Sequence, residues 1–403
     1  MVYLTKNGFW LTVGQFAASG GAIVLAVLFA NLLSKDVYGT YKYVLSIVSL
    51  LTISTLVGIN TSLAQGVARG SEGSFLRGLR VKMMWGMLGL GAAVITAGYY
   101  FLAHNTTLAW ALLLAAPFVP LMDPLSLHTT YLQGKRLFRQ SIIYFTLSQI
   151  LATLVVATAI FLTRDLYIIL AAYFLSWTLA RYFFHLRTLK YFSPNDVHDE
   201  SVITYGKHLT FIGVLTNVAT YIDDLFIFHF LGAAPVAVYN LAAAPIEQIR
   251  ALSKNIPTLA LPSLTTRSIA EINVLLYRRL WYLFFLGLGI AVVYTVAAPY
   301  LFTWVFPKYH DAIFISQLFA GTLALRLPGT FFGAVAQSKI HQIPAAWLYW
   351  GSAPQVVLIA LLVVLIPRWG LVGAVISVYV QLIVGFIIGF IQWFALTRRE
   401  RRL

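Results

Sequence analysis

The chain of 403 residues is 60% hydrophobic and 10% charged, and its mean hydropathy is +0.82. This leaves too little polar surface to cover a soluble globule, so the composition predicts an integral membrane protein. The net charge of +15 does not indicate nucleic-acid binding, because the basic residues are distributed by side of the membrane.

Twelve apolar stretches, each close to the roughly 20 residues that cross a hydrocarbon core, follow one another along the chain. They predict transmembrane helices over residues 8–33, 39–63, 82–103, 108–128, 142–163, 167–187, 207–231, 234–256, 277–303, 312–337, 345–366 and 370–396. A longer loop at 188–206 separates the first six helices from the last six. The sequence therefore predicts an all-α fold with two six-helix lobes, residues 1–200 and 201–403.

An internal repeat relates the two lobes. The segment Leu88–Val94 returns 198 residues later as Leu286–Val292, and the same offset aligns Arg80 with Arg278. Beyond the loop that follows the third helix, the offset becomes 204. Because each half crosses the bilayer six times, both halves keep the same orientation, which predicts parallel repeats of the kind found in alternating-access carriers.

The positions of lysine and arginine predict the topology. Most of them lie near the termini or in loops that follow even-numbered helices, as with Arg77, Arg80 and Lys82. The exceptions lie on the opposite side: Lys35, Arg164, Lys308 and Arg368. By the positive-inside rule both termini are cytoplasmic, and the first span is expected to be an uncleaved anchor. The chain contains no cysteine, so thiolate metal sites are excluded, and we expect no cofactor.

Prolines interrupt matched helices of the two halves. Pro117, Pro120 and Pro124 lie in the fourth predicted helix, and Pro328 lies in the tenth, at the position equivalent to Pro124. Broken helices at matched positions favour a substrate cavity or a flexing segment. Ordinary proline kinks, which membrane helices tolerate, are the alternative.

Polar residues follow helical spacing on the seventh and eighth predicted helices. One stripe consists of Thr210, Asn217, Thr220 and Asp224, and the other of Asn240, Glu247, Arg250 and Lys254. Through the repeat, Asn240 corresponds to Lys42 in the second helix. Polar faces on repeat-related helices predict a common site in the cleft between the lobes, because ionisable groups in a bilayer are costly elsewhere.

The stripes suggest a division of roles. A hairpin turn near Ala233 would bring Asp224 within one helical turn of Glu247. We interpret one set as binding an anionic substrate: Arg250, Lys254, Lys42, Asn240 and Asn217. A second set would exchange a proton or sodium ion: Asp224, Glu247 and Asp223, the last being one position off the stripe and expected to face a neighbouring helix. A static ion pair between Asp224 and Arg250 is the structural alternative.

Three further charged residues lie within predicted spans. Arg181 is near the cytoplasmic end of its helix and is expected to extend its guanidinium toward the interface. Asp123 directly precedes Pro124 and Arg326 lies two residues before Pro328, which makes them a candidate pair between the lobes.

The chain contains no motif for a familiar catalytic reaction. Neither a phosphate-binding G-x-x-x-x-G-K-[ST] loop, nor H-E-x-x-H, nor a serine elbow is present, and every predicted outward loop is short. These features favour transport over catalysis, so we expect that the protein is not an enzyme.

Several segments carry a family resemblance. Leu33–Tyr41 (LSKDVYGTY), Ser46–Leu50 and Gly58–Asn60, with Arg69 beyond them, resemble the polysaccharide-transporter branch of the MOP exporters, whose fold is MATE-like. The segment Leu231–Asn240 resembles the start of the second lobe in the same family. That branch includes the flippases for O-antigen and related lipid-linked oligosaccharides.

The resemblance implies a function and a location. It implies movement of undecaprenyl-diphosphate-linked oligosaccharide from the cytoplasmic to the outer leaflet of a bacterial or archaeal inner membrane, for lipopolysaccharide or another surface polysaccharide. A polysaccharide polymerase and glycosyltransferases of the same pathway, together with membrane lipids, are the implied partners. Two alternatives remain at this point: a proton- or sodium-coupled multidrug antiporter, and a membrane enzyme such as a polysaccharide polymerase.

Overall fold

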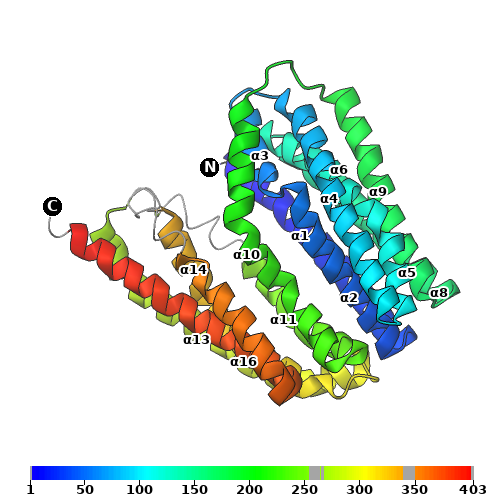
Figure 1. Cartoon of the computed structure of the whole chain (residues 1–403). Coiled ribbons are helices and arrows are strands. Elements are labelled where there is room, and N and C mark those ends of the chain that lie inside the picture. Colours follow the sequence, from blue (N-terminus) through cyan, green and yellow to red (C-terminus); the bar gives the residue numbers. More distant parts are fainter. Residues whose placement is uncertain (1, 254–263, 265–266, 339–349, 401–403) are drawn as a thin grey trace. The chain divides into compact units, whose positions relative to one another are not determined.

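The computed structural model describes residues 2–253, 264, 267–338 and 350–400 (Figure 1). Within these ranges every regular element is a helix, as the composition predicts. Contacts divide the chain into two compact units, Met1–Tyr221 and Ile222–Leu403, so the division falls inside a helix and not in the preceding loop.

Unit 1 is a bundle of helices joined by short connections. Its elements are α1 (Val2–Leu32), α2 (Lys35–Leu51), η1 (Thr52–Thr55), α3 (Gly58–Ala68), α4 (Ser74–Leu102), α5 (Thr106–Ala115), η2 (Ala116–Phe118), α6 (Val119–Leu125), α7 (Leu127–Gly134), α8 (Phe138–Leu162), α9 (Leu166–Tyr191) and the first part of α10 (Glu200–Leu231). One buried cluster of this unit includes Ile59, Leu63, Phe75, Leu127 and Tyr131.

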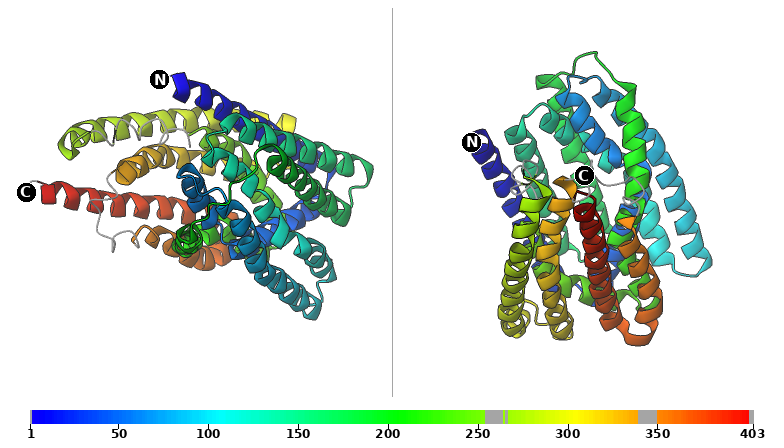
Figure 2. Two further views of the ribbon diagram at one scale, coloured as in Figure 1. Left: turned by 90° about the horizontal axis from the view of Figure 1, so that it is seen from above. Right: turned by 90° about the vertical axis from the view of Figure 1, so that its left-hand side faces the viewer.

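The described part of unit 2 contains the rest of α10 and four further long elements. They are α11 (Ala233–Ser253), α13 (Ile269–Val305), α14 (Ala312–Ser338) and α16 (Ala353–Glu400). In Figure 2, α13, α14 and the C-terminal part of α16 run alongside one another. Their buried residues include Ile272, Leu276, Phe331, Phe332 and Trp393.

Side-chain caps explain where several helices begin. The Ser34 hydroxyl accepts from the backbone N–H of Val37 at the start of α2, and Asp165 caps α9 in the same way. Ser268 and Glu271 form a reciprocal capping box at the start of α13. Each cap satisfies backbone N–H groups that the first helical turn leaves without a partner.

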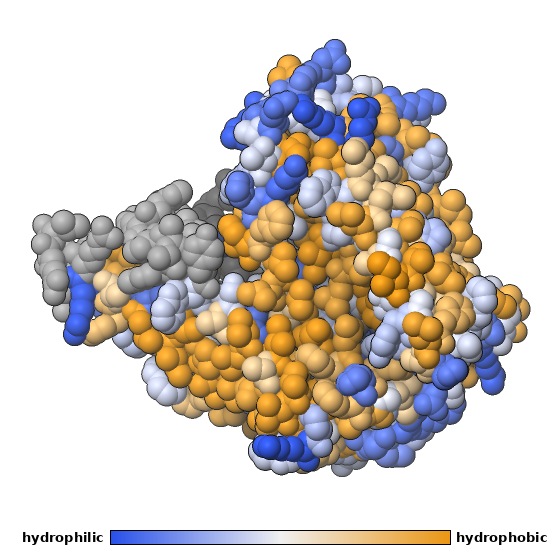
Figure 3. All heavy atoms as spheres, in the orientation of Figure 1, coloured by the Kyte–Doolittle hydropathy of each residue, from blue (hydrophilic) through white to orange (hydrophobic). Residues whose placement is uncertain are grey.

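Eight helices among the described residues are long and apolar enough to cross a membrane, or nine if one bent pair forms a single span. Their outward side chains suit a lipid environment: Leu102, Leu162 and Val274 are 84%, 77% and 78% exposed. In Figure 3 the sides of the unit 1 helices are apolar, whereas hydrophilic residues gather at the end with the α9–α10 loop. This distribution confirms a membrane protein with several spans.

The longest element, α16, is two helical legs. At Gly370 the backbone adopts φ 55° and ψ −136°, a conformation that is sterically allowed essentially for glycine alone. A Cβ on Gly373 would lie 2.3 Å from the Leu365 carbonyl oxygen, although eight residues of straight helix span about 12 Å. The chain therefore folds back at this point, and the two legs correspond to the separate stretches predicted over 345–366 and 370–396.

The repeat predicted from sequence reappears as equivalent contacts. In unit 1, α4 approaches α6 so closely that a Cβ on Gly89 would lie 2.8 Å from Val119. In unit 2, a Cβ on Gly287 would lie 2.5 Å from Leu323. Because Gly287 and Leu323 are the positions that the offsets of 198 and 204 assign to Gly89 and Val119, the same helix pair packs through the same positions in both halves.

The loop before α10 is attached to unit 1. The Gly73 N–H donates to the Val197 carbonyl at 2.8 Å, and the Asn195 side chain donates to the Gly70 carbonyl at 3.0 Å. At the start of α10, the Thr210 hydroxyl accepts from the Gly58 N–H at 2.9 Å. These contacts explain why the unit boundary lies within α10, after the segment that the loop and α3 hold.

Candidate functional site

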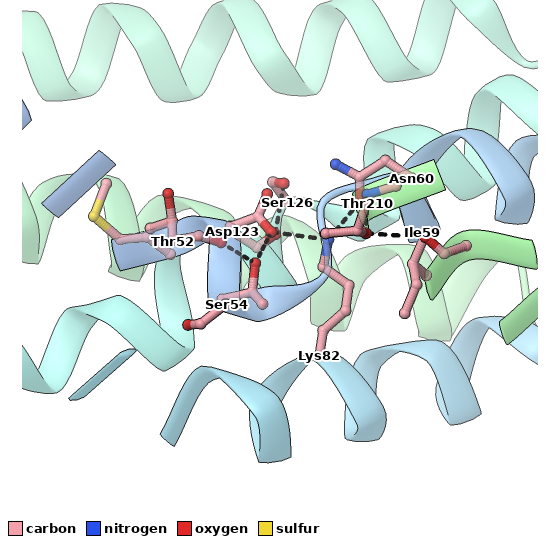
Figure 4. Close-up of polar contacts among 12 residues, drawn as sticks. Thr52, Ser54, Ile59, Asn60, Lys82, Asp123, Ser126 and Thr210 are labelled. Atoms are coloured by element: carbon pink, nitrogen blue, oxygen red, sulfur yellow. Dashed lines mark hydrogen bonds and ion pairs between the residues drawn. The ribbon is translucent and has the colours of Figure 1, made fainter. Parts of the chain in front are cut away.

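A buried ion pair connects the broken helices of unit 1. The ammonium of Lys82 is fully buried in α4, with its Nζ 2.8 Å from Asp123 Oδ2 and 2.6 Å from Asn60 Oδ1 (Figure 4). The sequence-based assignment of Lys82 to a cytoplasmic loop is wrong. The helix α4 begins at Ser74, about two turns before Lys82. A buried ammonium requires such partners, since an isolated charge in the bilayer interior is expensive.

The same ion pair lies where two segments are not continuous helices. Asp123 lies in the short helix α6, and it accepts a hydrogen bond from Thr55 in η1. The segment Lys35–Thr55, which ends with η1, meets Gly58–Ala68 at 47°, and Leu56 between them adopts φ 61°. Serine and threonine hydroxyls that bond nearby carbonyls compete with helix geometry, as Ser54 does with the Leu51 carbonyl at 2.7 Å.

The prediction that Arg181 extends its guanidinium toward the interface is wrong. Its Nη1 donates to the Met122 carbonyl at 2.6 Å, and its guanidinium lies 4.7 Å from the centre of the Trp177 ring. The prediction failed because the break between α6 and α7 leaves a carbonyl available inside the bundle. Asp123 and Arg326, proposed as a pair between lobes, each have an oppositely charged partner within their own unit.

The predicted stripe on α10 separates into two parts. Thr210 contacts α3, as described above, whereas Asn217 and Thr220 donate to carbonyls one turn earlier, those of Gly213 and Thr216. Asp224 lies at the far end of the helix in unit 2. Lys42, expected to join the same site, lies in α2 of unit 1 with its Nζ 5.8 Å from the centre of the Tyr38 ring.

Two adjacent carboxylates face α11 from the end of α10. Tyr239 Oη donates to Asp223 Oδ2 at 2.9 Å, and Asn240 Nδ2 donates to Asp224 Oδ1 at 2.6 Å. Asp223 thus faces the neighbouring helix as expected, but Asp224 does so too. The turn lies at Gly232, with φ 93°, so Asp224 lies opposite Asn240, whereas the sequence predicted a position closer to Glu247.

A basic cluster lies further along α11. Arg250 Nη1 is 3.0 and 2.9 Å from the two carboxylate oxygens of Glu247, and Arg326 Nη1 from α14 is 3.8 Å from Glu247 Oε1. The sequence identified Glu247 and Arg250 on α11 as candidates, but it did not place Arg326 beside them. Lys254, the fourth member of the predicted stripe, lies outside the described residues.

These arginines line a cavity within unit 2. Its volume is about 530 Å³, and both arginines form part of its wall. The other polar side chains on the wall are uncharged: Thr330, Gln355 and Gln381. Sequence reasoning missed these three, because an isolated neutral polar residue in an apolar helix gives no periodic signal. Their common location appears only when α14 and both legs of α16 are packed.

The sequence of this chain matches one protein family. A sequence profile described as "Polysaccharide biosynthesis protein" matches residues 4–266, which is more than half of the chain. No curated protein sequence matches the chain significantly.

Several solved membrane transporters have a similar fold. The lipid II flippase MurJ in an inward closed conformation gives a TM-score of 0.68 at 14% identity, covering 96% of this chain and 87% of that one. An outward-facing multidrug-resistance MATE transporter of the MOP superfamily gives 0.65 at 16% identity, covering 98% and 96%. A MOP transporter from Pyrococcus furiosus gives 0.59 at 15% identity, covering 95% and 96%.

At these identities the structural likeness establishes the fold, and the profile match establishes the family. The helical bundle, the internal repeat and the predicted resemblance all agree with this result. This chain belongs to the polysaccharide biosynthesis protein family and has the fold of the MOP-superfamily transporters.

Proposed function

We propose that this protein is a flippase for an oligosaccharide linked to undecaprenyl diphosphate, which it moves from the inner to the outer leaflet of the cytoplasmic membrane by alternating access. The observation that carries this proposal is the arginine-lined cavity in unit 2, in a chain of the polysaccharide biosynthesis family. Polymerase and glycosyltransferases of the same pathway are its expected partners, and it acts as a transporter without a cofactor.

The chemistry of the cavity suits such a head group. Guanidinium groups bind phosphate oxygens through two parallel hydrogen bonds, and Arg250 and Arg326 supply two such groups. The neutral amides of Gln355 and Gln381 can donate to and accept from sugar hydroxyls. Charged side chains are costly within a bilayer, so their presence beside a cavity supports a role in binding an anionic substrate.

A proton- or sodium-coupled multidrug antiporter is the second candidate. It is favoured by one specific observation, the adjacent carboxylates of Asp223 and Asp224 at the end of α10. Such a pair suits cation exchange, and it would bind organic cations better than the basic cavity would. In the flippase, the same carboxylates would couple transport to an ion.

The decisive experiment uses proteoliposomes that contain undecaprenyl-diphosphate oligosaccharide. Exposure of the glycan to a membrane-impermeant glycan-cleaving enzyme is followed over time, with and without the protein. We expect protein-dependent exposure, and we expect Arg250→Ala to slow it by about tenfold or more, because a hydrogen bond to a charged group contributes about 1.5–3 kcal/mol.

The matched control is Arg368→Ala, which removes an exposed arginine of the same unit away from the cavity. Normal exposure in Arg250→Ala, with protein levels equal to wild type, would contradict its role as an anion anchor. Ion-driven uptake of a cationic dye without glycan exposure would favour the antiporter and direct attention to Asp224.

A further inference from the structure

Arg326 is incompletely satisfied beside the cavity. Its side chain is 15% exposed, and its Nε is buried without a hydrogen-bond partner among the residues that the structure describes. The Glu247 carboxylate, 3.8 Å from Nη1, lies beyond normal hydrogen-bond distance. A buried guanidinium with an unused donor is costly unless an acceptor approaches it, and the side chain forms part of the cavity wall.

Glu247 is shared unequally between two arginines. Its two carboxylate oxygens lie within 3.0 Å of Arg250, whereas its contact with Arg326 is the longer one, at 3.8 Å. One carboxylate facing two guanidinium groups leaves these three side chains with a net charge of about +1. The arrangement is therefore suited to a ligand with more negative charge than a single carboxylate.

The three side chains also differ in how firmly they are held. Those of Glu247 and Arg250 are 44% and 42% exposed, so moving Glu247 away requires little repacking. Arg326 is much more buried and remains fixed in α14. An entering phosphate would meet one buried, undercompensated arginine and one arginine whose present partner is partly exposed.

We propose that Glu247 is an intramolecular counter-ion of the anion site, which the substrate's diphosphate displaces, and that Arg326 is the deeper anchor for that diphosphate. This inference rests on the proposed flippase function and adds a mode of release. While the site is empty, the carboxylate partly neutralises both arginines. When substrate leaves, the carboxylate returns and competes with rebinding, which prevents the basic site from retaining its anionic cargo.

The test measures binding of inorganic pyrophosphate to the purified full-length protein in detergent by calorimetry. Glu247→Gln keeps the size of the side chain but removes its charge, so the variant should bind pyrophosphate roughly twofold to fivefold more tightly, the effect expected of a partly exposed ion pair. Arg326→Gln should weaken binding, and the double variant should lose most of the gain.

The matched control is Glu200→Gln, which breaks another arginine–glutamate pair of the same 2.9 Å length, that with Arg77 in unit 1. It should leave pyrophosphate affinity unchanged. Unchanged or weaker binding in Glu247→Gln, or no binding by either wild type or this variant, would overturn the inference, provided that the unfolding temperature is normal. Failure of wild-type protein to expose lipid-linked glycan in proteoliposomes would instead refute the proposed flippase function, while the pyrophosphate result would stand.

Discussion

Lys82 and Asp123 place opposite charges at positions where the second half of the chain has only hydrocarbon. The repeat offsets of 198 and 204 assign them to Leu280 and Leu327, which are 7% and 5% exposed. The same fold therefore packs with either an ion pair or two leucines at these positions. We therefore expect that packing does not require the ion pair, which connects α4 with α6 and with residues on both sides of the bend after η1.

This comparison predicts the effect of removing one or both charges. Lys82→Leu leaves the Asp123 carboxylate buried without its cation, and the loss of one partner from a buried pair costs about 3–5 kcal/mol. The combined substitution Lys82→Leu and Asp123→Leu should recover most of that loss, because it places buried leucines at both positions, as in the second half. Thermal unfolding in detergent measures both variants.

The single change Asp123→Leu is the complementary control. It should also destabilise the protein, because it leaves the buried Lys82 ammonium without its counter-ion. A double variant as unstable as either single variant would show that Asn60 and Thr55 need the charges, and that the second half is not a valid template for the first.

Individual candidate residues could be recognised from sequence more readily than their partners. Intramembrane charge identified Asp224, Glu247, Arg250 and Arg326, because such residues are rare in apolar helices. Their contacts depend on details that helical periodicity lacks. The turn at Gly232 sets which α11 residue meets Asp224, and the break after α6 gives Arg181 an internal acceptor.

Close helix packing in both units depends on glycines that lack space for a side chain. A Cβ on Gly89 would lie 2.8 Å from the Leu51 carbonyl, and one on Gly287 would lie 2.5 Å from the Leu323 carbonyl. Two residues later in each helix, Gly91 and Gly289 have no neighbouring atom within 4 Å of a Cβ. The repeated segment thus contains one glycine that is required by packing and one that is not.

Alanine substitutions separate these two kinds of glycine. Gly89→Ala and Gly287→Ala should each lower stability by roughly 1–3 kcal/mol, because backbone atoms must move to admit a methyl group. Gly91→Ala and Gly289→Ala should be neutral, or should raise stability by about 0.5–1 kcal/mol through better helix propensity. Unfolding temperatures of the four variants decide this, and equal effects within a pair would contradict the packing.

Helices were the most predictable elements, since apolar length alone identifies a span. Matched glycines revealed which helices correspond in the two halves. The sequence did not show that Asp199, in the loop before α10, would attach to Ser74, at the start of α4. Contacts of that kind place the unit boundary within α10, because they join the loop and the first turns of the next helix to unit 1. Hydropathy does not report contacts between a loop and a distant helix end.

The topology of the chain depends on α11. This helix carries Asn240, Glu247 and Arg250, and it is not among the eight apolar candidates for a membrane span. If it crosses, the loop between α13 and α14 is external under the positive-inside assignment. If it does not cross, that loop lies on the cytoplasmic side, and twelve spans with parallel repeats become impossible.

Because the chain contains no cysteine, single cysteines can locate three loops without a background signal. We select exposed positions: His104 between α4 and α5, Asp196 in the loop before α10, and His310 between α13 and α14. In intact cells, a membrane-impermeant maleimide should label His104→Cys and His310→Cys, whereas Asp196→Cys should react only after permeabilisation. His104→Cys and Asp196→Cys test the predicted orientation of unit 1. Protection of His310→Cys, with the other two labelled as expected, would mean that α11 does not cross, and the arginine-lined cavity would then require a different topology.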